Sequence, residues 1–76
     1  MLSSKRRKKK LREKYEELST HLTEMREAAD GADEYAAFKC FESTESQLHT
    51  VQAKAARAIE CIWTIKELEA VSEEMP

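Results

Sequence analysis

The chain has 76 residues, with two cysteines, one glycine, one proline and a formal net charge of −2 at pH 7. This length leaves room for one domain, and a lone chain of this size buries too little apolar surface to be comfortably stable without help. Two cysteines are too few for a disulfide scaffold, and no apolar run resembles a signal peptide or a membrane span, so we expect a cytoplasmic protein with free thiols.

The basic residues gather at the N-terminus. The first 14 residues carry eight Lys or Arg and one Glu, whereas residues 15–76 carry five basic and fourteen acidic residues. We expect residues 1–10 to form a partly frayed basic arm, because cations in a first turn oppose the helix dipole. In a eukaryotic cell this run would also fit a nuclear import signal. The residues expected to contact an anion or nucleic acid are Lys5, Arg6, Arg7, Lys8, Lys9, Lys10, Arg12 and Lys14.

Residues 11–76 are predicted to form a helical hairpin, because Ala, Glu, Lys, Leu and Arg make up about half of the chain. In the first helix, apolar residues recur at alternating spacings of four and three, which predicts one narrow apolar face. They are Leu11, Tyr15, Leu18, Leu22, Met25 and Ala29. The segment Asp30-Gly31-Ala32-Asp33 then predicts the turn, since Gly31 can end one helix and Asp33 can cap the next. The first helix is therefore expected to end at about residue 29.

The second helix is predicted over about residues 34–73, which makes it longer than the first. Folding the chain at Gly31 leaves the apolar residues after Ala58 beyond the last apolar residue of the first helix. We therefore expect a partner to cover them, and the chain to oligomerise into a helical bundle. The predicted partner interface consists of Phe38, Ala56, Ile59, Ile62, Trp63, Ile65 and Leu68.

One alternative fold remains open at Ser43–Gln47, where Thr44 followed by Gln47 resembles a capping box that would start a new helix. A break at this point would produce a three-helix bundle with no uncovered apolar segment. The apolar periodicity passes through Thr44 without a change of phase, which favours a continuous helix.

The sequence offers little for catalysis. His21 and His49 are the only side chains that titrate near neutral pH, and neither lies at the spacing of a nucleophile or zinc motif. We therefore predict no enzyme activity, no cofactor and no metal site. The leading hypothesis is a protein-protein interaction module, a small helical-hairpin adaptor, assembly factor or co-chaperone. Its partner would be a second copy, with a dimer favoured, or a helix of another protein. The alternative is a nucleic-acid-binding regulator that uses the basic arm on a dimeric bundle.

Overall fold

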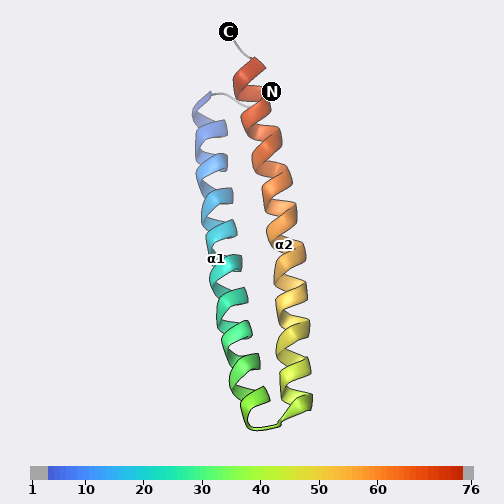
Figure 1. Cartoon of the computed structure of the whole chain (residues 1–76). Coiled ribbons are helices and arrows are strands. Elements are labelled where there is room, and N and C mark those ends of the chain that lie inside the picture. Colours follow the sequence, from blue (N-terminus) through green and yellow to red (C-terminus); the bar gives the residue numbers. More distant parts are fainter. Residues whose placement is uncertain (1–3, 75–76) are drawn as a thin grey trace.

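The computed structural model describes residues 4–74, and the side chains of residues 4–70. Two helices, α1 (Ser4–Ala37) and α2 (Phe41–Glu74), pack side by side as an antiparallel hairpin (Figure 1). Its principal dimensions are 57 × 14 × 14 Å. The prediction of an all-helical hairpin is confirmed. The prediction of a longer second helix is wrong, because each helix contains 34 residues.

The turn lies at residues 38–40, seven or eight residues later than predicted. Lys39 adopts a left-handed conformation with φ of 61°. The Lys39 amide donates to the Ala36 carbonyl at 3.0 Å, and the Cys40 amide donates to the Tyr35 carbonyl at 2.9 Å. These two bonds form a Schellman motif, in which glycine is the usual left-handed residue. Lysine therefore holds the position that the sequence analysis assigned to Gly31.

Helix α1 runs through Asp30–Asp33 without interruption, and Gly31 has no positive φ. A glycine within a helix costs about 1 kcal/mol relative to alanine. A turn at Gly31 would cost more, because α1 would lose the burial of Ala28 and Ala32 and would be too short to pack along the whole of α2. Continuation of α1 places Ala28 and Ala32 in the interface between the helices. The uncovered segment predicted at the end of α2 is absent for this reason.

Two other expectations change with the helix boundaries. Residues 4–10, expected as part of a frayed arm, form the first turns of α1, while residues 1–3 lie outside the described part of the chain. Helix α2 is continuous through Ser43–Gln47, so the three-helix alternative is wrong. Thr44 is helical, and its hydroxyl donates to the Cys40 carbonyl at 2.9 Å.

The core of the hairpin is small. Buried and half-buried residues recur at alternating spacings of three and four on each helix, as expected for two helices that pack at a shallow angle. The buried ones are Ala28, Ala32, Ala58, Cys61 and Ile65, and no side chain among residues 4–70 is completely buried. Three alanines allow the helix backbones to approach closely, but they remove little apolar surface from water.

Candidate protein interface

The hairpin has two flanks, one on each side of the plane that contains both helix axes, and their chemistry differs. Cross-helix contacts establish which residues share a flank. The Tyr15 hydroxyl of α1 donates to the Glu69 carboxylate of α2. Residues seven apart on a helix point in nearly the same direction, so Leu22 shares the flank of Tyr15, and Ile62 and Leu48 share the flank of Glu69.

This side of the molecule is an apolar flank. Its large side chains are Tyr15 and Leu22 from α1 and Leu48, Ile59 and Ile62 from α2. Each of the five is between 41% and 50% exposed. Ile59 belongs to the same surface because it lies three residues before Ile62, one turn away on the same side. Trp63, 61% exposed, lies four residues after Ile59 at the outer rim, and Ala56 is exposed at the same rim.

The opposite side is a polar flank, with a shallow cleft between the helices. Its lining residues are Lys14, Glu17, His21, Arg57, Glu60, Cys61 and Thr64. The Cys61 thiol donates to the Glu17 carboxylate at 3.5 Å, and Lys14 pairs with the same carboxylate at 3.1 Å. Near this cleft, Lys54 of α2 forms an ion pair with Glu24 of α1.

These contacts shift the ionisation of the polar flank. The hydrogen bond from Lys54 holds the pKa of Glu24 below its ordinary value, and the hydrogen bond from Lys14 does the same for Glu17. Burial, followed by the hydrogen bond to Glu17, raises the pKa of the Cys61 thiol. The Nδ1 atom of His21 is buried and has no hydrogen-bond partner. The polar flank is thus occupied by contacts between the two helices.

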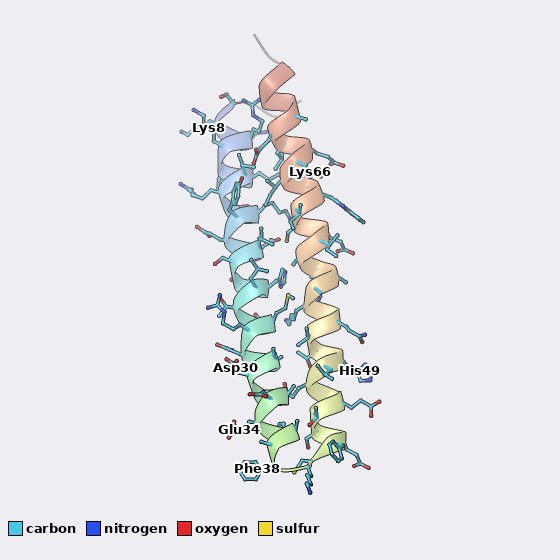
Figure 2. All side chains as sticks on the ribbon, in the orientation of Figure 1. Lys8, Asp30, Glu34, Phe38, His49 and Lys66 are labelled. Atoms are coloured by element: carbon cyan, nitrogen blue, oxygen red, sulfur yellow. The ribbon has the colours of Figure 1, made fainter. Side chains whose placement is uncertain are left out.

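The predicted interface residues divide into three groups. Ala56, Ile59, Ile62 and Trp63 are exposed side by side on α2. Ile65 is buried and Leu68 is half-buried, because α1 covers the segment that was expected to lack cover. Phe38 is 75% exposed at the turn, which Figure 2 shows far from the end that carries Lys66.

The residues that the prediction missed are Tyr15, Leu22 and Leu48. Tyr15 and Leu22 were expected on the one apolar face of the first helix, where their spacing fits, but the structure leaves both of them, like Leu48, about half exposed. The seven-residue repeat of Leu11, Leu18 and Met25 forms the contact, and the repeat of Tyr15 and Leu22 lies beside it. The spacing of apolar residues in the sequence could not show which of these two adjacent repeats faces α2.

The predicted anion-binding residues form a cationic surface at the start of α1. Lys5, Lys8, Lys9 and Arg12 line one open depression, which follows from their positions on consecutive turns of one helical face. Arg7 and Lys14 are half-buried, and Lys14 is engaged by Glu17. Arg6 and Lys10 are exposed around the same helix.

Comparison with protein-family models, with curated proteins and with solved structures gave no match for this chain. Neither described helix has an apolar stretch long enough to cross a membrane. Within residues 4–74, no three His, Cys, Asp or Glu side chains come together as metal ligands.

Proposed function

We propose that this chain is a non-enzymatic protein-protein interaction module, a small helical-hairpin adaptor or assembly factor that binds a helical partner through its apolar flank. The observation that carries the proposal is the alignment of five large, half-exposed apolar side chains from both helices on one side. A surface of two neighbouring helices that presents apolar residues at helical spacing suits the apolar face of another helix.

The energetics of the hairpin support the proposal. Its buried core holds one isoleucine, one cysteine and three alanines, which is little for a domain that must offset its own conformational entropy. Complete burial of a large apolar side chain contributes roughly 1.5–3 kcal/mol, so covering the exposed half of each flank residue adds on the order of 1 kcal/mol. A partner on this flank would therefore stabilise the fold as well as the complex.

Site-specific photo-crosslinking in the cell that makes the protein tests the proposal. A photoreactive phenylalanine analogue at Ile59 should crosslink to a defined protein band. The same photoreactive analogue in place of Ala53 serves as the matched control, because Ala53 is exposed on the same helix but lies toward the polar flank. Equal, weak labelling from both positions would overturn the proposal.

A second candidate function rests on the cationic surface. Because Lys5, Lys8, Lys9 and Arg12 share one depression, four positive charges face a single direction and would suit a phosphate backbone. A nucleic-acid-binding regulator would show an affinity for RNA or DNA that falls steeply with salt. Replacing Lys8, Lys9 and Lys10 by glutamine should abolish that binding, and an affinity that these changes leave intact would exclude this function.

A further inference from the structure

The apolar flank carries charges of opposite sign at its two ends. Asp33 lies 11 residues, about three helical turns, after Leu22, and therefore faces the same side. Glu45 lies three residues before Leu48, and Lys66 lies seven after Ile59. Lys8 lies seven before Tyr15, and Lys5 and Arg12 neighbour it on the same side. The open end of this flank thus presents Lys5, Lys8, Arg12 and Lys66, and its turn end presents Asp33 and Glu45, all of them exposed.

Three contacts establish the register between the helices. Glu24 pairs with Lys54, Glu17 contacts Cys61, and a side chain at Gly31 would meet Gln47 at 3.5 Å. In each pair the two residue numbers add to 78, so residues of α1 and α2 with this sum lie side by side, at the same level along the hairpin. Asp33 and Glu45 also add to 78 and therefore lie at one level. Arg12 and Lys66 likewise share a level near the open end. Figure 2 shows Lys8 and Lys66 at that end and Phe38 at the other.

We propose that a second copy of this chain covers the apolar flank, with the two hairpins antiparallel and related by a two-fold axis near Leu22 and Ile59. This inference rests on the proposed function and names its partner. Helix α1 spans residues 4–37, and we place the axis at its middle. A residue of α1 in one chain then lies beside the α1 residue of the other chain for which the two residue numbers add to 41. Lys8 of one chain then lies at the level of Asp33 and Glu45 of the other.

The position of the apolar residues fits the same axis. They extend from the level of Tyr15 to the level of Leu48, which lies beside residue 30 of α1 by the register above. The middle of this apolar stretch lies about two residues along α1 from the middle of the helix. The two-fold rotation therefore places the apolar stretch of one chain opposite the apolar stretch of the other. Covering the flank in this way buries the large side chains of both copies together, as a closed two-fold interface requires.

A parallel arrangement is disfavoured by the same charges. It would bring the open ends together, with Lys8 near Lys8, and the acidic turn ends together, with Asp33 near Asp33. Like charges at close range oppose association and select against that orientation. Among the described side chains of residues 4–70, two charges run against the pattern: Glu69, which accepts the Tyr15 hydroxyl, and Arg26, which lies near the middle.

Cys40 provides a direct measurement of the orientation, because it is exposed at the turn whereas Cys61 is buried. A nitroxide label on Cys40, in a Cys61→Ala background, allows the distance between the two labels of a dimer to be measured by electron-electron double resonance. Helices of 34 residues are about 51 Å long at 1.5 Å per residue, so antiparallel hairpins separate the labels by about 50 Å. Parallel hairpins would hold them within about 20 Å, since neighbouring helices pack 8–10 Å apart.

The expected result is a dimer by sedimentation with the long label distance. A dimer with the short distance would overturn the antiparallel arrangement and leave the proposed function standing. A stable monomer at 100 μM or more would overturn the second copy as partner. If Ile59 then crosslinked to another protein in the cell, the proposed function would survive, and if it crosslinked to nothing, both would fail.

Charge reversal gives an independent test. Replacing Asp33 and Glu45 with lysine should weaken dimerisation at low salt about tenfold, and adding Lys5→Glu and Lys8→Glu should restore it. The matched control is Glu27→Lys with Glu34→Lys, which changes the charge equally but on exposed residues, seven apart, that lie toward the polar flank beside Glu24. Equal weakening by both pairs of substitutions would overturn the proposed contact.

Discussion

The two flanks of the hairpin are built from the same two helices but use their side chains differently. On the polar flank, Glu17 contacts Cys61, and Glu24 forms an ion pair with Lys54, so charged groups of α1 are engaged by α2. On the apolar flank, the Tyr15 hydroxyl donates to the Glu69 carboxylate, and the large side chains beside this bond stay half exposed. On the polar flank the carboxylates of Glu17 and Glu24 have partners on the other helix, whereas on the apolar flank the large side chains have no such cover.

This difference shows how a minimal fold can divide two tasks between its sides. Polar contacts between the helices fix the register, because an ion pair or hydrogen bond requires specific partners at one level. Apolar contacts are less selective about register but contribute more free energy per residue when they are covered. The polar flank therefore aligns the helices, and the apolar flank keeps large exposed side chains that the proposed partner would cover.

The largest expected effect is that of Ile59→Glu, which places a charge in the middle of the apolar flank. We expect the dissociation constant for self-association to rise roughly 100-fold, about 2.8 kcal/mol, because a buried carboxylate there would have no partner. Sedimentation equilibrium over a concentration series measures this. Ala53→Glu, toward the polar flank of the same helix, should change it by less than about threefold. Equal effects of the two substitutions would remove the distinction between the flanks.

The two cysteines should differ in reactivity. Cys40 is exposed, whereas Cys61 is buried beside Glu17 and its pKa is raised, so alkylation of Cys61 should be slower by on the order of tenfold or more. The two thiols lie 21 residues apart, about 32 Å along the helix axis, and should form no disulfide within one chain. Mass spectrometry after a timed iodoacetamide pulse measures the reactivity. Equal rates would mean that the polar flank opens readily.

The assignment of residues to flanks depends on the turn at residues 38–40. Lys39→Gly should raise the free energy of unfolding by about 1 kcal/mol, because glycine adopts the left-handed conformation without the penalty of a β-carbon. Gly31→Ala should also stabilise by up to about 1 kcal/mol, since its new methyl would meet Gln47 at an ordinary 3.5 Å. Both are measured by urea unfolding. Destabilisation by Gly31→Ala would indicate a turn at Gly31.

The smallest effect concerns the ion pair of the polar flank. The pKa of Glu24 is lowered from its ordinary value of 4.5, so its interaction with Lys54 stabilises the fold above that pH. The contribution is lost as the pH falls through the lowered pKa of the folded state. Lys54→Met should therefore make stability less dependent on pH between 6 and 3, as urea unfolding would show. An unchanged slope would mean that this pair contributes nothing to the stability of the fold.

The helical class could be predicted from the shortage of glycine and proline, and the periodicity that continues through Thr44 favoured the hairpin over the three-helix alternative. The turn could not be predicted. Gly31 flanked by Asp30 and Asp33 is the strongest local turn signal in the chain, and Phe38-Lys39-Cys40 contains no residue that favours a turn. Packing between the two helices outweighed this local signal. A turn at residues 38–40 gives α1 and α2 equal length, so that each helix packs along the whole of the other.

The candidate interface was predicted in part. Ile59, Ile62 and Trp63 are exposed within the chain, although not because the end of α2 is uncovered, and their contact with a partner stays a prediction. Tyr15 and Leu22 were missed because two apolar repeats run next to each other on α1, and the choice between them depends on which face meets α2. That choice is determined by the register, which contacts such as Glu24 with Lys54 establish.

The three-residue turn also has a consequence for the order in which the hairpin forms. Contacts next to Lys39 close a loop of a few residues, whereas the bond between Tyr15 and Glu69 joins groups 54 residues apart. Because loop closure costs more entropy as loops lengthen, pairing is expected to begin at the Schellman motif and to propagate toward Ser4. Amide hydrogen exchange should be slowest near the middle of the interface and fastest near the N-terminus of α1. A residue at position 39 that favours the left-handed conformation should accelerate folding rather than slow unfolding.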